Sequence, residues 1–448
     1  MSPCEPLPIP TSTVIVVPGE YTHDNFLESV WLEEEFSVTS NAFLPKEQPL
    51  TRLPHPYYQP WENLIEHLSR LLQNGTLRQK VGGLPVLSIE LLSTEAELRR
   101  GYVVLAFLTH AYVWGGSSPS EILPPQIAVP LQAISSRLNM PPVATYAAVN
   151  LWNYHSSSSD FSDLDSLQAL HTFTGTEDES WFFMVSVAME AVGGHIIPVM
   201  LSALQNSSHP DKLAAALGEI TQCIRVLGKI LDRMDERCDP NVFYHRIRPF
   251  LAGSKNMVSC GLPKGVFYSL DGSDKNGEWK ELRGGSNGQS SLIQLFDILL
   301  GVEHKTGSPD TKGESFHQEV RGYMPDGHRR FLEFVENKYP GGLRTAVEIM
   351  ASEDDNAQQE DVKVAFREAT NALAEFRNKH LQIVARYIII PSRQASQRGA
   401  GLVKNLATIS ASETKKELTG TGGTALLPFL KQSRDGTFRA GDFCNSSR

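Results

Sequence analysis

The feature that most restricts how this chain can fold is a long amphipathic helix with a histidine on its apolar side. Between Asp361 and Pro391, apolar residues recur at spacings of three, four or seven, which is the repeat of a helix with one buried side. His380 lies on that side, four residues after Phe376 and three before Ile383. Helical repeats dominate the rest of the chain and strand alternation is scarce, so we expect a mainly α fold.

A histidine directed at a protein core needs a partner for each of its two ring nitrogens. Hydrogen bonds inside the core satisfy most such histidines, and on the pattern alone this is the commoner outcome for His380. The alternative is a metal ion on one nitrogen and a carbonyl or carboxylate on the other. Haem is the more specific form of that alternative, because one imidazole suffices and the porphyrin needs a wide apolar slot between helices.

Composition narrows the function classes. Of the 448 residues, 41% are hydrophobic and 21% are charged, which is typical of a globular protein. The net charge is -10 and no Lys/Arg-rich tract occurs, so we expect no nucleic-acid partner. The five cysteines are widely spaced and form no C-x-x-C motif, so neither a disulfide framework nor a cysteine-based zinc site is expected.

The sequence also predicts where the protein resides. The N-terminus lacks the basic start and apolar stretch of a secretory signal. No run of about 18 apolar residues is present, so no membrane span is expected. We therefore expect a cytoplasmic protein.

The order of patterns along the chain predicts two domains, at 1–175 and 176–448. The first ~45 residues are rich in proline and are expected to form an extended arm. Helices are expected at 61–72, 91–114, about 128–138, 142–154, 181–204 (interrupted by Gly193 and Gly194), 212–235 and 292–302. Polar or glycine-rich loops are expected at 155–160, 175–180, 252–290, 303–316, 352–360 and 392–424. The last is long for a compact domain, which indicates a mobile lid or a disordered stretch.

Two glycine-rich segments carry possible chemistry. Gly284–Ser291 contains a G-x-S-x-G pattern centred on Ser286, but the preceding residues are mostly polar, whereas a nucleophile elbow needs a buried strand. This segment either caps the next helix or brings its backbone close to a flat ligand. Gly420–Thr424 is not a phosphate-binding loop, because no Gly-Lys-Ser/Thr follows. It is either a hinge or a lid with the hydroxyl of Thr421 at its tip.

Taken together, these segments resemble the indoleamine 2,3-dioxygenase family, in particular its fungal members. The resemblance runs from about residue 40 to about residue 435, and it is specific because the motifs occur in the same order along the chain. The matching segments are Ile127–Pro130, Pro141–Pro142 with Tyr146, Gly284–Ser291, Phe296–Gly301, Tyr323–Pro325, His328–Arg329, His380–Pro391 and Gly420–Thr424.

The resemblance implies a small N-terminal helical domain and a larger all-helical domain that holds haem b. His380 would be the proximal iron ligand, and Arg377 with Asp297 would hold the haem propionate region. Arg248 would meet the substrate carboxylate, for which a bidentate guanidinium is well suited. Thr421 would close over the substrate. The distal pocket would be built from Tyr146, Phe182, Ser186, Phe243, Tyr244, Gly285, Ser286 and Asn287.

The implied activity is cleavage of the indole C2–C3 bond of L-tryptophan by O2 to give N-formyl-L-kynurenine, the first step of the kynurenine route towards NAD. The protein would be a monomer, with Ser186 and Arg248 as the residues closest to the chemistry. The electron-rich indole needs no strong protein base. Two departures from the family concern the pocket: Tyr244 replaces a usual Phe and Asn287 a usual Ala.

These departures leave the haem assignment unchanged and bring substrate affinity into question. They support an alternative function, a haem-binding paralogue that senses haem, O2 or tryptophan with little turnover. A serine hydrolase built on Ser286 is a third function from another class. A haem absorption spectrum and a tryptophan assay would separate the three.

Overall fold

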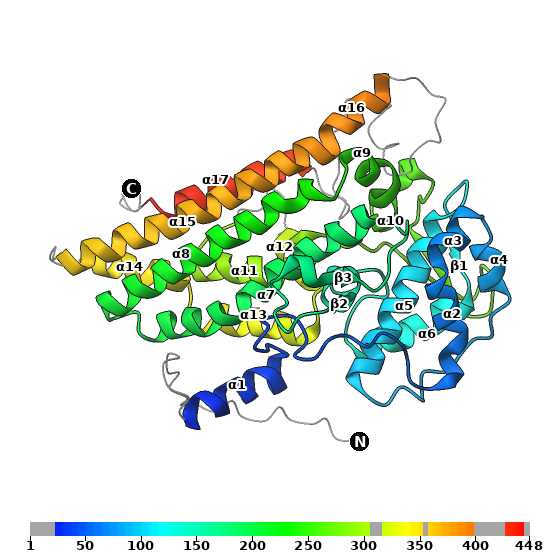
Figure 1. Ribbon diagram of the computed structural model, residues 1–448, viewed down its shortest axis with the longest axis horizontal. Helices are drawn as coiled ribbons and strands as arrows, with labels where there is room; N and C mark the ends of the chain where they lie inside the picture. Colours follow the sequence, from blue (N-terminus) through cyan, green and yellow to red (C-terminus); the bar gives the residue numbers. More distant parts are fainter. Residues whose placement is uncertain (1–22, 305–315, 353–356, 398–425, 443–448) are drawn as a thin grey trace.

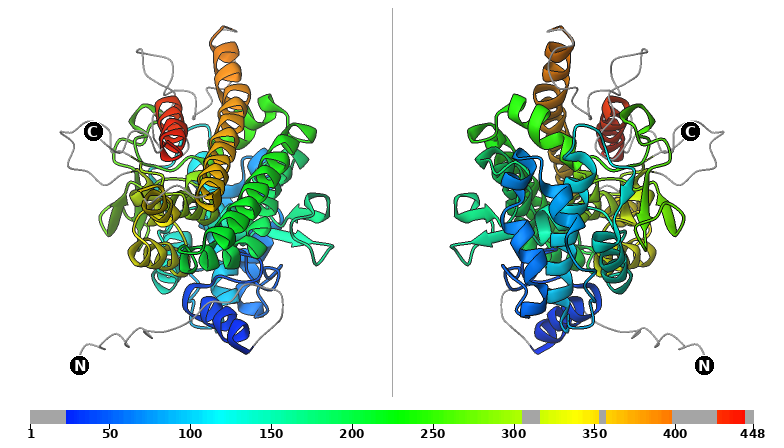
Figure 2. Two further views of the ribbon diagram at one scale, coloured as in Figure 1. Left: turned by 90° about the vertical axis from the view of Figure 1, so that its left-hand side faces the viewer. Right: turned by 90° about the vertical axis from the view of Figure 1, so that its right-hand side faces the viewer.

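Helices dominate the computed structural model, which confirms the expected fold class (Figure 1). The structure describes residues 23–304, 316–352, 357–397 and 426–442. Its centre is formed by four long helices: α7 (Glu177–Gln205), α8 (Pro210–Asp232), α15 (Ala357–Val384) and α17 (Leu426–Ala440). Helix α8 packs against both α7 and α15, and α17 lies beside α15 in both views of Figure 2. The apolar side of α15 is buried in this bundle, as at Phe366 and Leu373.

The helix expected over 361–391 is confirmed, and the helical path is longer than the pattern indicated. It begins at Ala357, passes through a π-helical turn at Ala385–Ile389 and continues as α16 (Ile390–Gln397). Pro391 does not end it and lies at the second residue of α16, directly after the π-helical turn. The loop expected to start at residue 392 is therefore helical as far as Gln397, and residues 398–425 lie outside the described residues.

Helix α7 runs without interruption through Gly193, Gly194 and Pro198, so the expected break was wrong. The glycines are there for close packing. A Cβ atom on Gly194 would lie 2.1 Å from the carbonyl oxygen of Ser40, and one on Gly193 would lie 2.8 Å from a methyl group of Leu292. By length and composition α7 could cross a membrane, but 78% of its most apolar 18-residue window is buried inside the protein, as in a core helix.

A cluster of shorter helices forms the N-terminal part. Its members are η1 (Pro56–Tyr58), α2 (Gln59–Glu66), α3 (Leu68–Gln73), α4 (Leu77–Gly82), α5 (Glu95–Trp114) and α6 (Pro125–Arg137). The single helix expected over 61–72 is two helices that meet at His67. Helix α5 begins where Thr94 and Glu97 form a capping box, which satisfies two backbone N–H groups at its start. A buried ion pair between Glu62 and Arg100 ties α2 to α5.

Two small sheets add short strands to this mainly α fold, including strands within 252–290 and at 155–156, where the sequence predicted loops. β1 (Ile122–Leu123), β4 (Val266–Ser269) and β5 (Gly277–Lys280) form one sheet, and β2 (Tyr154–Ser156) pairs antiparallel with β3 (Leu167–Ala169) in the other. β1 pairs in parallel with β4, with Ile122 opposite Phe267, so a strand from each side of the proposed division at residue 175 shares one sheet. The division coincides with Thr176, the N-cap of α7, and separate domains stay a prediction.

Other local expectations were wrong as well. Only Ala147–Leu151 is helical within 142–154, as a π-helical turn (η2) before β2. The expected N-terminal arm contains α1 (His23–Phe36), which packs on α13 (Asp326–Lys338) through aromatic contacts such as that of Trp31 with Phe334 at 5.6 Å between ring centroids. The remaining elements are η3 (Leu164–Ser166), η4 (Arg233–Glu236), α9 (Pro240–Val242), η5 (Phe243–Ile247), α10 (Arg248–Leu251), η6 (Val258–Cys260), η7 (Asn287–Gln289), α11 (Ser291–Leu299), α12 (Phe316–Arg321) and α14 (Gly342–Ser352).

Candidate functional site

A large cavity lies between α7, α8, α11, α15 and the glycine-rich segment at residues 285–288. Its empty volume, with the open mouth included, is about 1740 Å³. Such a slot between helices is where bundle proteins hold flat cofactors. Most of its wall is apolar: Val149, Phe182, Met189, Leu231, Met234, Phe243, Leu251, Leu292, Ile293, Phe376, Ile383, Val384, Ile388 and Leu430.

His380 lines this cavity from α15 and makes no hydrogen bond or ion pair with any residue that the structure describes. His110 shows the opposite outcome. Its Nδ1 lies 2.7 Å from the carbonyl oxygen of Phe250, and its Nε2 accepts a hydrogen bond of 3.1 Å from the amide of Ala144. The commoner fate of a core histidine therefore applies to His110 and not to His380. Burial, with a contribution from Arg377, lowers the pKa of His380 to about 4, so the imidazole is neutral and able to ligate a metal.

Arg377 lines the cavity one turn before His380 and is held in place from behind. Its Nη2 lies 2.5 Å from Oδ1 of Asp297, and its Nη1 donates to Thr437 on α17. Asp297 does not line the cavity itself. Burial alone would raise the pKa of Asp297, but Arg377 and His304 outweigh it and hold that pKa well below its usual range. The pair thus keeps a cation at the cavity wall.

The two arginines of the segment Phe243–Phe250 have opposite environments, as the sequence predicted. Arg248 is 3% exposed and lines the cavity, whereas Arg246 faces solvent. The Arg248 guanidinium lies 5.7 Å from the ring centroid of Tyr244. Tyr244 is fully buried and does not line the cavity. Burial raises the pKa of its hydroxyl, which Arg248 and Ser392 on α16 partly counteract. The residue that departs from the expected Phe is therefore in the core and not in the cavity wall.

The remaining predicted pocket residues divide into those that line the cavity and those that do not. Phe182 and Phe243 line it with ring centroids 4.7 Å apart. Tyr146, Gly285, Ser286 and Asn287 line it as well. Ser186 is buried behind the hydroxyl of Tyr146. Thr421 lies outside the described residues.

Ser286 is not placed as a catalytic nucleophile. It is the N-cap of η7, where its side chain accepts a hydrogen bond from the amide of Gly288, and residues 281–286 form no strand. The nucleophile elbow that a serine hydrolase needs is therefore missing at this position. The helix-capping and ligand-approach interpretations of this segment are both compatible with its place at the cavity wall.

The chain matches the family model described as indoleamine 2,3-dioxygenase over residues 32–440. The chain belongs to the indoleamine 2,3-dioxygenase family. It is 42% identical to the indoleamine 2,3-dioxygenase nanC of Aspergillus nanangensis, over 89% of this chain and 94% of that protein. It is 37% identical to the indoleamine 2,3-dioxygenase of Saccharomyces cerevisiae, over 93% and 95%. It is also 37% identical to the 6-hydroxytryptophan 2,3-dioxygenase fscD of Fusarium equiseti, over 90% and 96%.

Membership of the indoleamine 2,3-dioxygenase family makes this chain a haem-dependent dioxygenase. The cavity fits such a group: it has mostly apolar walls, a neutral imidazole without a hydrogen-bonding partner among the described residues, and a buried cation at the wall. Asn150 also lines the cavity, and its buried Oδ1 has no hydrogen-bonding partner among the described residues. This is a further sign that a bound group belongs in the cavity. The cavity in this structure therefore fits the haem group that the family relationship implies.

The sequence interpretation missed Glu190 in the wall of this dioxygenase's cavity. Its Oε1 accepts hydrogen bonds from the hydroxyls of Tyr146, at 3.0 Å, and Ser290, at 2.5 Å. Burial raises the pKa of Glu190 to about 7, which the two hydroxyls only partly counteract. The signal was present, since Glu190 is the one acidic residue of the apolar stretch 181–204 and lies one turn after Ser186.

Proposed function

We propose that this protein binds haem b through His380 and uses O2 to open the indole ring of L-tryptophan, giving N-formyl-L-kynurenine. The observation that carries the proposal is the His380 imidazole, which lines an apolar cavity and has no hydrogen-bonding partner among the described residues. Two further observations support it: a buried cation in the same cavity, and relatives named as dioxygenases of indoleamines and of 6-hydroxytryptophan. The product would enter the kynurenine route towards NAD.

The residues of the cavity would hold the haem and position the substrate. Haem, when bound, supplies the iron at which O2 is activated for insertion into the indole C2–C3 bond. His380 would ligate the iron, and Arg377, fixed by Asp297, would meet a haem propionate. Arg248 would hold the substrate carboxylate, while the rings of Phe182 and Phe243 would pack against the indole and exclude water.

A turnover assay under isotopically labelled O2 tests the proposal. Holoenzyme kept ferrous by a chemical reductant should convert L-tryptophan to N-formylkynurenine with both oxygen atoms from O2. Absence of haem from the purified protein would refute the haem assignment. A normal haem spectrum without product would leave a haem protein and refute the tryptophan activity in favour of the sensing alternative.

A second substrate refines the assay. One relative is named for 6-hydroxytryptophan, and Asn287 brings an amide to the cavity wall where the family usually has a methyl group. Parallel assays with L-tryptophan and 6-hydroxytryptophan should show the higher kcat/KM for L-tryptophan. Replacing Asn287 by Ala should raise kcat/KM for L-tryptophan if the amide narrows the pocket, and an unchanged ratio between the two substrates would show that Asn287 does not select between them.

A further inference from the structure

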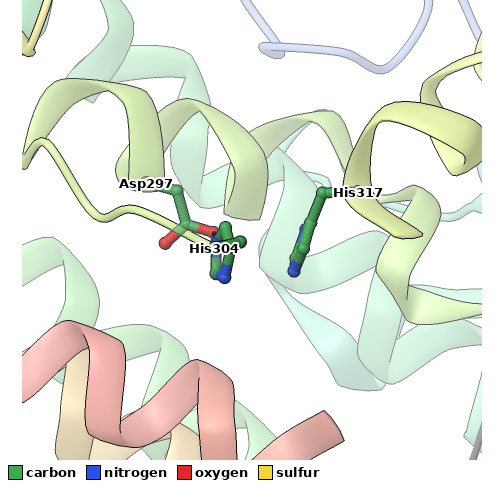
Figure 3. Close-up of side chains that lie close together, drawn as sticks. All are labelled: Asp297, His304 and His317. Atoms are coloured by element: carbon green, nitrogen blue, oxygen red, sulfur yellow. Dashed lines mark hydrogen bonds and ion pairs between the residues drawn. The ribbon is translucent and has the colours of Figure 1, made fainter. Parts of the chain in front are cut away.

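A group of side chains that could hold a metal ion lies next to Arg377, between the apolar cavity and a surface pocket. Asp297 comes from α11, His304 from the segment after it and His317 from α12, and their ligand atoms all lie within 4.8 Å of one another (Figure 3). Nε2 of His304 is 2.8 Å from Oδ2 of Asp297. The rings of His304 and His317 stack with centroids 3.6 Å apart. Two imidazoles and a carboxylate thus lie close together.

We propose that Asp297, His304 and His317 form a binding site for a divalent transition-metal ion, of which Zn²⁺ is the representative. Two imidazole nitrogens and one carboxylate oxygen, with water in the remaining position, are a donor set that Zn²⁺ takes. Ligands on a tetrahedral zinc ion lie about 3.3 Å apart.

The carboxylate of Asp297 can serve both of its neighbours at once. Its Oδ1 is 2.5 Å from Arg377, whereas its Oδ2 is directed at His304. A metal ion on Oδ2 would therefore replace the hydrogen bond from His304 and leave the contact with Arg377 in place. Access is open, because the three residues line a surface pocket that also includes Glu303, Glu336 and Glu348. Glu336 and Glu348 are paired there with Arg321 and Arg344, so the entrance carries charges of both signs.

A simpler interpretation is that the cluster only orients Arg377. That role needs Asp297 and, as a second partner for its carboxylate, His304. It does not need His317, whose ring stacks on His304 between the cavity and the surface pocket. His317 therefore distinguishes the two interpretations: it is a ligand in the first and dispensable in the second.

A bound metal ion would also change the electrostatics of the cavity. A cation on Asp297 draws carboxylate charge away from Arg377, whose guanidinium lines the cavity wall. Zinc should therefore shift the absorption spectrum of the bound haem. This consequence rests on the proposed function, whereas zinc binding itself does not.

The test is equilibrium dialysis of the untagged holoenzyme against Zn²⁺, with zinc and iron counted by elemental analysis. The matched variants are His304→Gln, whose amide can still donate to Asp297, and His317→Phe, which keeps the stacked ring. His155→Ala removes an exposed histidine on β2 and is the control. The parent and the control should bind one zinc per chain, and each cluster variant should bind it at least about 10-fold more weakly.

Two results would overturn the site: no zinc bound by the parent at micromolar free Zn²⁺, or equal zinc binding by the parent and both cluster variants. Iron content and the haem spectrum of each variant show whether it is folded and loaded. Zinc binding in a protein that lacks haem would leave the metal site standing and refute the proposed function, so the two failures are distinguishable.

Discussion

At the scale of single residues, His110 and His380 show that a lowered pKa does not decide what a histidine does. Both lie on apolar sides of long helices, and burial lowers the pKa of each to about 4. His110 has a hydrogen-bonding partner on each ring nitrogen, whereas His380 has none among the described residues and lines a cavity. The partner is a property of the folded chain, so the helical repeat could locate His380 and could not assign its role.

Replacing His380 by Ala should give a folded protein that purifies without stoichiometric haem. The reason is that His380 would be the protein ligand of the iron, and its described neighbours in the wall, Phe376, Ile383 and Val384, are apolar and cannot replace it. The measurement is the ratio of haem absorbance to protein, with far-ultraviolet circular dichroism as the check on folding. His209→Ala, an exposed histidine before α8, is the control and should keep its haem. Full haem occupancy with an unchanged spectrum in His380→Ala would refute the ligand assignment.

Replacing Arg248 by Ala should raise the KM for L-tryptophan by about one to two orders of magnitude. A charge-assisted contact with the substrate carboxylate is worth roughly 1.5–3 kcal/mol, and its loss weakens binding by the corresponding factor. Arg246→Ala is the matched control, because Arg246 is two positions away and exposed. Haem content should be the same in both variants. A large effect of Arg246→Ala with none from Arg248→Ala would show that the wrong arginine was assigned.

The family resemblance predicted the residues that line the cavity better than the residues that lie behind them. Arg248 and Phe182 were predicted and line the cavity, because a resemblance carries over the residues that face a shared ligand. Tyr244 and Ser186 lie one layer further out. Glu190 was missed because its two hydroxyl partners come from segments 44 and 100 residues away, and such pairings depend on tertiary structure.

At the scale of elements, α7 shows why glycines in a helical stretch need not end the helix. The cost of a glycine inside a helix is about 1 kcal/mol, which dense packing on both sides can offset. Gly194 lets the backbone of Ser40 approach α7, and Gly193 accommodates Leu292 of α11. Neither contact can be inferred from a local sequence pattern. A break was therefore expected at a position where the helix packs closely on its neighbours.

Gly194→Ala should therefore lower the free energy of unfolding by about 1–3 kcal/mol, because the added methyl group would overlap a backbone oxygen that cannot rotate away. Gly218→Ala is the matched substitution in α8. That site is exposed, has no atom within 4 Å of the new Cβ, and should gain up to about 1 kcal/mol from helix propensity. Chemical denaturation of each variant measures whether its free energy of unfolding falls or rises relative to the parent. Equal effects would mean that the approach of Ser40 does not restrict position 194.

Element prediction was most successful for long helices and least for short strands. α8 and α15 have many repeats of one apolar side, so their pattern is strong. The strands β4 and β5 have four residues each, and β1 has two, which is too short for alternation to be recognised. β1 also pairs with a strand that lies more than 140 residues later in the sequence, and this pairing fixes it as a strand.

At the scale of the whole molecule, His110 joins three segments and should make stability depend on pH. It lies on α5, donates from Nδ1 to the carbonyl oxygen of Phe250 in α10 and accepts from the amide of Ala144 before η2. Burial lowers its pKa from 6.5 to about 4, so between these values the unfolded chain binds more protons than the folded one. Stability should therefore be fully present above pH 6.5 and be lost as pH falls towards 4, by up to about 3 kcal/mol.

His110→Gln should flatten this slope, because the amide can replace one hydrogen bond and does not titrate. Urea unfolding of the haem-free protein at a series of pH values between 4.5 and 7.5 measures it, and the difference between parent and variant isolates His110 from the other buried histidines. An identical slope in both proteins would show that His110 is protonated in the folded state as easily as in the unfolded one.

Glu190 should change the pH dependence of the free energy of unfolding in the opposite direction. Burial raises its pKa from 4.5 to about 7, so the folded chain binds more protons than the unfolded one in this window, and the contribution to stability is lost as pH rises from 4.5 to 7. Glu190→Gln keeps an oxygen that can accept from Tyr146 and Ser290 and cannot ionise. The variant should therefore gain stability relative to the parent at pH 7.5, by up to about 3 kcal/mol, and little at pH 4.5. A gain of the same size at both values would mean that the carboxyl of Glu190 does not titrate in this range, and that its place beside the cavity depends on shape and hydrogen bonding alone.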